Sequence, residues 1–257
     1  MTFAMTLAYA AVLAGVFGLL LGSFLNVVAY RLPRGQSLAF PGSHCPSCET
    51  PIRPWDNVPV LSWLWLKGRC RACRGSISAR YPVVEATTAA LLVAVVLVKG
   101  ADRDAWLGLA FVLLLVPVTL IDLDHWIIPN KLMGLGAAVA LSILALTDPG
   151  SIPEHLIAAA AAGGFLLIAA VAYPAGMGMG DVKLAAVMGL FLGRDVGAAM
   201  LVALVAGSVV GAAIIARKGA AEGRKTAIPF GPYLAFGGLV GLFAGGAVVD
   251  WYLNTFA

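Results

Sequence analysis

Long apolar runs, separated by short polar segments, make up most of this chain. A helix needs about 20 apolar residues to cross a bilayer, with a range of about 17–25. The pattern predicts about eight transmembrane helices, at residues 4–29, 83–100, 105–121, 131–148, 155–173, 182–193, 196–216 and 229–252. The sixth run is short, so it is either a thin or tilted helix or one that continues across Arg194 and Asp195.

Composition supports an all-α integral membrane protein. The 257 residues are 61% hydrophobic and 12% charged, whereas an ordinary soluble domain is about 45–50% apolar and about 25% charged. The first run is followed, not preceded, by the cations Arg31 and Arg34, the reverse of a secretory signal. We expect it to remain as a transmembrane helix with its N-terminus outside.

The positive charges predict the orientation. If the segment after the first helix is cytosolic, fourteen of the 17 Lys and Arg residues face the cytosol. These are Arg31, Arg34, Arg53, Lys67, Arg69, Arg71, Arg74, Arg80, Lys131, Lys183, Arg217, Lys218, Arg224 and Lys225; only Lys99, Arg103 and Arg194 face the other side. This asymmetry follows the positive-inside rule. It explains the net charge of +4 by membrane topology, so nucleic acid is not an expected partner.

Four cysteines lie in the cytosolic loop as two C-x2-C pairs, Cys45/Cys48 and Cys70/Cys73, separated by 21 residues. Disulfides would suit an extracytoplasmic loop, but a reducing cytosol disfavours them. Each pair can offer two thiolates to one metal, and four thiolates form the usual tetrahedral structural zinc site with no open position for catalysis. The pattern favours structural Zn2+, with His44 as a bystander.

Two aspartates mark the ends of apolar runs. Asp122 follows the third run, and Asp181 lies in Gly178-Met179-Gly180-Asp181 before the sixth. Each has an ordinary structural explanation, Asp122 as part of an interfacial turn and Asp181 as a helix N-cap. However, the predicted topology places both at the cytoplasmic face.

Together the two acids predict an aspartic protease. Two carboxylates held close together share one proton, so one can activate water while the other protonates the scissile carbonyl. Gly178 and Gly180 lack side chains and would let an extended substrate approach closely. Asp124 is the alternative partner for Asp122, whereas His125 is more simply an interfacial histidine.

Several segments resemble the bacterial type IV prepilin peptidases, a family of bifunctional leader peptidase/N-methyltransferases and GxGD aspartic membrane proteases. The similarity runs nearly end to end. It is carried by residues 22–33 (GSFLNVVAYRLP), the cysteine pairs with 56–64 (DNVPVLSWL) and 77–85 (ISARYPVVE), the GxGD segment 178–183 (GMGDVK), and 228–235 (IPFGPYLA). One departure is Pro129-Asn130, where the family usually has Pro-Asp.

The resemblance implies cleavage of the basic leader of type IV prepilins and pseudopilins, after a glycine, on the cytoplasmic side of the bacterial inner membrane. It implies N-methylation of the new N-terminus with S-adenosylmethionine, Asp122 and Asp181 as catalytic residues, and zinc on the tetracysteine loop. Pili or type II secretion systems would lie downstream. No G-x-G-x-x-G unit is present, so the cofactor-binding residues are unknown.

The implied domains are a first helix at 1–29, a methyltransferase-associated loop at 30–82 and a seven-helix peptidase core at 83–257. The sequence leaves three alternatives open: a peptidase without methyltransferase activity, a GxGD protease acting on general membrane stubs, and a non-enzymatic ion transporter. A transporter would place its acids at mid-span beside cations, and no Lys or Arg lies mid-span here.

Overall fold

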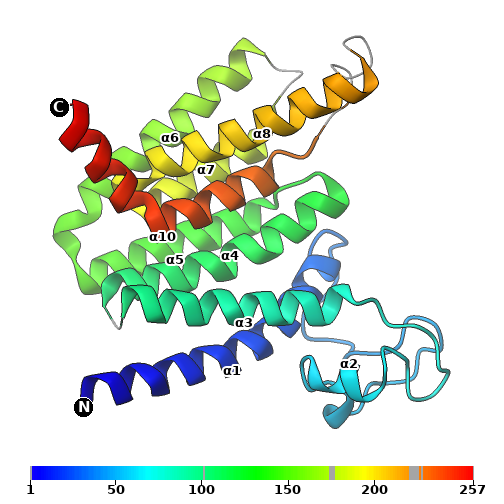
Figure 1. The fold of residues 1–257 in the computed structure, drawn as a ribbon. Coiled ribbons are helices and arrows are strands. Elements are labelled where there is room, and N and C mark those ends of the chain that lie inside the picture. The colour runs from blue at the N-terminus through cyan, green and yellow to red at the C-terminus, as the bar shows by residue number, and fades with distance from the viewer. Residues whose placement is uncertain (1, 101, 174–176, 220–225, 227, 257) are drawn as a thin grey trace. The chain divides into compact units, whose positions relative to one another are not determined.

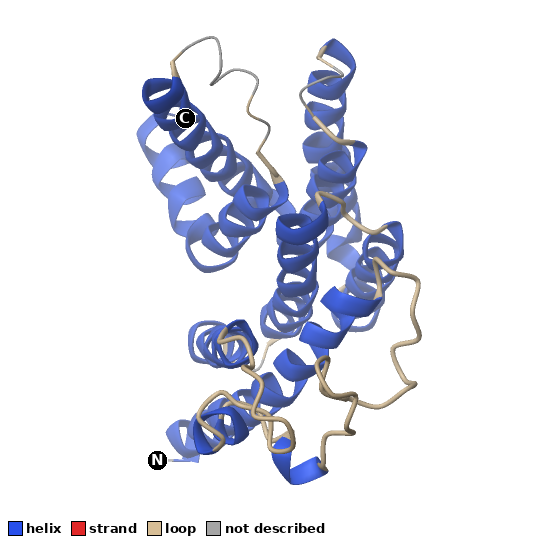
Figure 2. Cartoon of the chain, turned by 90° about the vertical axis from the view of Figure 1, so that its right-hand side faces the viewer, coloured by secondary structure: helices blue, strands red, loops and turns tan. Residues whose placement is uncertain are grey.

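A computed structural model describes residues 2–100, 102–173, 177–219, 226 and 228–256. Within these residues the protein is helical and has no strand, only two isolated bridges in the loop (Figure 2). The helices are α1 (Thr2–Arg31), η1 (Pro54–Asp56), α2 (Leu61–Trp65), α3 (Arg80–Lys99), α4 (Arg103–His125), α5 (Asn130–Thr147), η2 (Pro149–Ser151), α6 (Ile152–Ala172), α7 (Met179–Leu192), η3 (Gly193–Asp195), α8 (Val196–Lys218) and α10 (Gly231–Phe256). The predicted all-α class is confirmed.

Seven stretches of the described chain are long and apolar enough to cross a membrane, and the longest, Met179–Lys218, contains both α7 and α8. The prediction of about eight transmembrane helices is therefore confirmed, and the chain is a multi-pass membrane protein. The short sixth run ends at Leu192 because Gly193, with φ +54°, turns the backbone into η3. Arg224 and Lys225, which were counted as cytoplasmic cations, lie outside the described residues.

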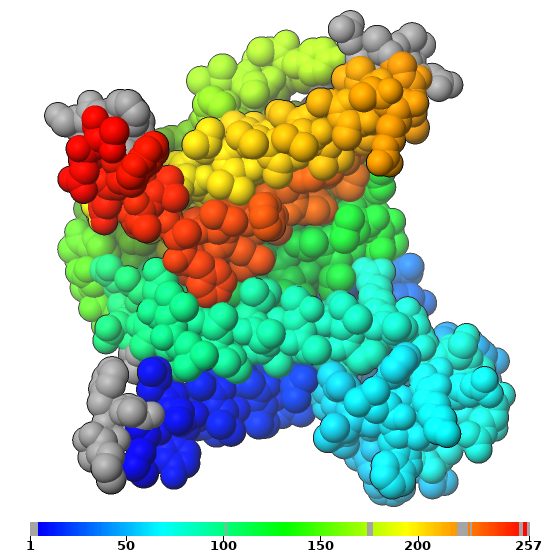
Figure 3. Space-filling view, viewed as in Figure 1, coloured from blue at the N-terminus to red at the C-terminus, as the bar shows by residue number. Residues whose placement is uncertain are grey.

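The chain forms two compact units, Met1–Ala105 and Trp106–Ala257. In the first unit α1 and α3 pack along each other, and the segment between them forms a lobe at their ends (Figures 1 and 3). Glycines of α1 permit the contact: a Cβ on Gly18 would lie 2.5 Å from the Ala89 Cα, and one on Gly22 would lie 2.8 Å from the Glu85 Cα. Small residues commonly allow such close packing in membranes.

In the second unit α8 and α10 pack antiparallel along a glycine stripe on α10. Gly237 faces Ala199 and Ala203, while Gly245, two turns later, faces Asp195. Helices α6 and α7 also pack closely, since a Cβ on Gly189 of α7 would lie 2.4 Å from the Ala159 backbone nitrogen of α6.

Helix α4 lies against α7 and α10 in the same unit. Phe111 of α4 stacks on Phe191 of α7 with ring centroids 5.1 Å apart, and Phe111 also faces Gly238 of α10. From this level α4 runs on to Asp122, while α10 runs back to its first residue, Gly231. The end of α4 is thus brought to the beginning of α10.

Candidate active site and metal centre

Asp122 is buried one turn before the end of α4, with 5% of its surface exposed. The Gly231 N–H, the first of α10, donates a hydrogen bond of 3.0 Å to Asp122 Oδ2. This contact requires glycine, because a Cβ at Gly231 would lie 2.6 Å from the same oxygen. Just beyond the acid, Trp126 adopts φ +59° and donates its N–H to the Asp122 carbonyl oxygen at 2.9 Å, which ends the helix.

Asp181 is also buried, with 9% exposure, and is the third residue of α7. Its Oδ2 accepts the Gly178 N–H at 3.3 Å, while its own N–H donates to the Gly178 carbonyl oxygen at 3.1 Å. The alternative explanation of Asp181 as the N-cap is wrong in its position: Gly178 is the N-cap, the helix begins at Met179, and the Asp181 carboxylate accepts the N-cap N–H. This position aims a buried acid at the helix N-terminus, where negative charge is stabilised.

The structure brings Asp122 and Asp181 close enough for the carboxylates to repel each other electrostatically. Asp124, the alternative partner for Asp122, has an exposed side chain. His125 lies at the end of α4 and is half-buried. Of these titratable groups, only Asp122 and Asp181 are buried.

The neighbouring polar and glycine residues have structural contacts of their own. A Cβ on Gly180 would come within 3.0 Å of Ile128, so this glycine is also needed for packing. Asn130, the departure from the family pattern, accepts a hydrogen bond of 2.8 Å from Lys183 Nζ, which links the start of α5 to α7. Whether Gly178 and Gly180 admit a substrate stays a prediction.

The four cysteines form one cluster in the other unit, with all four Sγ atoms within 4.8 Å of one another. They do not form disulfides. His44 is exposed and its ring faces the Gly42 carbonyl oxygen, outside the cluster.

The two cysteine pairs have the same backbone geometry. Cys45 and Cys70 each accept a hydrogen bond from the residue four positions later and donate one to the carbonyl five positions later. Glu49 and Arg74, at equivalent places, both have left-handed backbones, with φ of 56° and 59°. Each pair is therefore a separate turn that aims two thiols at a common point.

The thiol geometry fits a tetrahedral metal site. Zn–S bonds of about 2.3 Å imply S···S separations of about 3.8 Å, and Cys45 Sγ and Cys73 Sγ are 3.8 Å apart. The Thr50 hydroxyl, 3.3 Å from Cys48 Sγ, lowers the pKa of the Cys48 thiol to about 6. The Gly75 backbone lowers the pKa of Cys73, but its neighbours, Cys48 first, outweigh this and raise it to about 11. A bound metal cation would allow all four cysteines to be present as thiolates at the same time.

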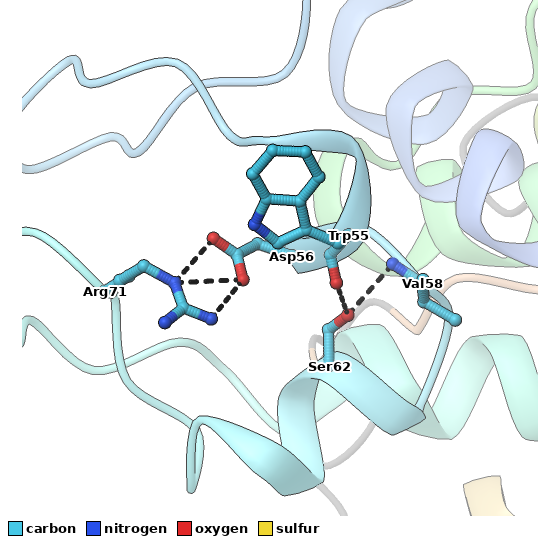
Figure 4. Close-up of polar contacts among 5 residues, drawn as sticks. All are labelled: Trp55, Asp56, Val58, Ser62 and Arg71. Carbon is cyan, nitrogen blue, oxygen red and sulfur yellow. Dashed lines mark hydrogen bonds and ion pairs between the residues drawn. The ribbon is translucent and has the colours of Figure 1, made fainter.

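Contacts around the cysteines fix the loop. Arg71, between the second pair, binds both carboxylate oxygens of Asp56, with a shortest distance of 2.6 Å, and lowers the pKa of that carboxyl (Figure 4). Ser62 of α2 donates to the Trp55 carbonyl oxygen and accepts the Val58 N–H, both at 2.9 Å. These bonds tie η1, α2 and the second cysteine pair into one structure.

Two residues that contact Asp122 or the cysteine-containing loop were not predicted from the sequence. Gly231 lies in the IPFGPYLA segment, but its bond to Asp122 spans 109 residues and leaves no local pattern. Glu85, buried in α3, accepts the Val60 N–H at 2.7 Å. A lone carboxylate inside an apolar run is the signal that could have identified it.

Known proteins match this chain over nearly its whole length. Residues 16–99 match the bacterial peptidase A24 N-terminal domain, and residues 109–216 match the type IV leader peptidase family. The chain is similar to the prepilin leader peptidase/N-methyltransferases of Aeromonas salmonicida (strain A449), Aeromonas hydrophila and Bacillus subtilis (strain 168). The identities are 34%, 35% and 31%, covering 93%, 94% and 93% of this chain and 92%, 93% and 96% of the relatives.

No solved structure matches the chain. The sequence relatives nevertheless cover nearly all of it, including the segments that hold both aspartates and all four cysteines. The chain therefore belongs to the type IV leader peptidase family.

Proposed function

We propose that this protein is an aspartic endopeptidase that removes the basic leader of prepilins or pseudopilins, cutting after a glycine. The relatives named prepilin leader peptidase/N-methyltransferase support the substrate class. The observation that carries the proposal is the pair of buried, interacting carboxylates of Asp122 and Asp181, each bound to one backbone N–H.

In the proposed mechanism the two aspartates hold one proton between them. The ionised carboxylate removes a proton from water, and the hydroxyl adds to the scissile carbonyl carbon while the other aspartate protonates the carbonyl oxygen. The tetrahedral intermediate then collapses, with the peptide C–N bond breaking and a proton passing to the nitrogen. The products are a leader with a new carboxyl terminus and a pilin with a free N-terminal amine.

The backbone bonds give each aspartate one fixed oxygen. Because Oδ2 of Asp122 and of Asp181 each accepts an N–H, the remaining Oδ1 atoms are available for water and substrate. Gly178 and Gly180 are proposed to admit an extended substrate backbone beside Asp181. An extended peptide binds through main-chain hydrogen bonds, so its backbone must come close to that of the enzyme, and glycines have no side chain in the way.

We further propose that the freed amine receives a methyl group from S-adenosylmethionine, as the names of the relatives suggest. S-adenosylmethionine supplies an electrophilic methyl group, and the amine must be unprotonated to attack it. The described residues contain no strand followed by a glycine-rich turn and helix, so no side chain is assigned to hold this cofactor.

Cys45, Cys48, Cys70 and Cys73 are proposed to hold Zn2+ as a structural ion, supported by the sulfur separations and the two matching turns. Four thiolates leave no place for a reacting water. The ion would instead keep the loop folded, because the loop has little apolar core of its own.

The proposed location is the cytoplasmic face of a bacterial inner membrane, on the strength of the asymmetric Lys and Arg distribution. We propose the loop 30–82 as the part associated with methyl transfer and the helices after it as the peptidase core. The cysteines and the aspartates fall in different compact units, which supports separable activities. Pilus or type II secretion components would receive the product.

Intact mass spectrometry of a prepilin co-expressed with the wild type or with Asp181→Asn tests these proposals. We expect leader loss and one added methyl group with the wild type, and neither with the variant. Leader loss without the methyl group would refute the methyltransferase part alone. An uncut panel of prepilins with the folded wild-type enzyme would refute the peptidase proposal.

A transporter is not favoured, because both acids lie at helix ends and none of the described residues near mid-span is Lys or Arg. A general GxGD protease would not need a four-thiol loop for its chemistry.

A further inference from the structure

The short helix α2 has two unlike faces. Ser62 is buried and hydrogen bonded to the neighbouring loop, and Trp63 is half-buried with its Nε1 donating to the Ile77 carbonyl oxygen at 3.0 Å. Leu61, Leu64 and Trp65 are instead 64%, 58% and 82% exposed. Their spacing of three and four residues places them on one side of the helix.

This exposed face is apolar although it lies in a loop rich in cations. Lys67 and Arg69, both exposed, follow it directly. An apolar helix face bordered by basic residues is the usual composition of a segment that lies in the membrane interface, where tryptophan is enriched and anionic headgroups attract Lys and Arg.

A hydrogen bond holds the start of α2 beside a membrane helix of its own unit. Val60, which immediately precedes α2, donates its N–H to Glu85 Oε2 at 2.7 Å. Glu85 is the sixth residue of α3, so it lies about 7 Å along that helix at 1.5 Å per residue. The beginning of α2 is therefore held within reach of one Glu side chain on the second turn of α3.

The contact with α1 also places Glu85 beside a membrane helix rather than beyond its end. A Cβ on Gly22 would lie 2.8 Å from the Glu85 Cα, and Gly22 is nine residues before the end of α1. At this end of α3, Tyr81 and Val83 are 45% and 59% exposed. The start of α2 thus lies near exposed side chains of a helix that is long and apolar enough to cross a membrane.

We propose that Leu61, Leu64 and Trp65 insert into the boundary between headgroups and acyl chains, so that α2 anchors the tetracysteine loop to the bilayer surface. The two ends of the loop are already tethered by α1 and α3, and α2 adds a third attachment between the two cysteine pairs. If the proposed function is right, this attachment keeps the loop at the surface where the amine of a membrane-held product would emerge.

The test uses the full-length protein in nanodiscs of phosphatidylcholine and phosphatidylglycerol, with either ordinary acyl chains or chains brominated near the headgroup. The fluorescence of Trp65 is obtained by subtracting the Trp65→Phe variant from the wild type. We expect bromine to remove at least half of this difference signal and aqueous iodide to remove little of it. A Leu64→Trp change in the Trp65→Phe background, which moves the indole along the same face, should restore the bromine response.

Two results would overturn the proposal. Quenching of the Trp65 signal by iodide but not by bromine would mean that α2 faces water. Quenching by neither would mean that protein, from this chain or another copy, covers the face. Equal zinc content in the wild type and the variants shows that the loop has kept its fold in each case.

Discussion

Replacing Gly231 with alanine tests whether the first N–H of α10 positions the proposed catalytic Asp122. The added Cβ would lie 2.6 Å from Asp122 Oδ2, about 0.8 Å inside the 3.4 Å at which ordinary contact begins. Gly231 does not have a left-handed backbone, and alanine has the better helix propensity. The helix should therefore form normally, and the carboxylate must move.

The size of the effect follows from the lost bond and the displacement. A hydrogen bond to a charged group contributes about 1.5–3 kcal/mol, and each 1.4 kcal/mol corresponds to roughly a tenfold change in rate. A misplacement of about 1 Å at a reacting group costs on the order of 10²-fold. We expect kcat/KM for leader removal to fall by about 10- to 100-fold, mainly through kcat.

The assay is cleavage of a purified prepilin by enzyme in nanodiscs, followed by mass spectrometry at several substrate concentrations. Gly246→Ala is the matched control, because it changes the same helix at a position where a Cβ meets nothing within 4 Å. Thermal unfolding of both variants should stay close to that of the wild type. A folded Gly231→Ala enzyme with kcat/KM within threefold of the control would refute the positioning role.

Three further outcomes are expected. Asp122→Asn and Asp181→Asn should each reduce cleavage at least 10³-fold without lowering the unfolding temperature; cleavage by either one would exclude the shared-proton mechanism. Cys48→Ser should release the metal, measured as zinc per purified protein, and a full complement of zinc would show that three thiolates suffice. Gly189→Ala should destabilise the protein by about 1–3 kcal/mol by forcing α6 and α7 apart, measured as unfolding temperature, whereas Gly134→Ala, with open space around its Cβ, should not.

The sequence predicted the transmembrane helices well because each apolar run must satisfy its backbone internally and is long enough to span the bilayer. It failed at the beginning of α7, where Gly178 and Met179 carry no strong start signal and Asp181 looked like an N-cap. Only the structure shows that the helix begins three residues earlier and that the carboxylate bonds back to Gly178.

The candidate site was predictable in its acids and thiols but not in its supporting contacts. Asp122 and Asp181 are recognisable because charge is costly at the ends of apolar runs, and the two C-x2-C pairs have metal-ligand spacing. The bonds from Gly231 to Asp122 and from Val60 to Glu85 join residues far apart in the chain. No periodicity or spacing along the sequence encodes such bonds, because tertiary packing alone creates them.

The bond between Asp122 and Gly231 also has a consequence for biosynthesis. Both aspartates belong to helices that leave the ribosome before α10, but the N–H that holds Asp122 arrives 109 residues after it. A nascent chain would carry both acids in the membrane while one of them still lacks its partner. The positioning of Asp122 is therefore completed only when the last described helix is inserted.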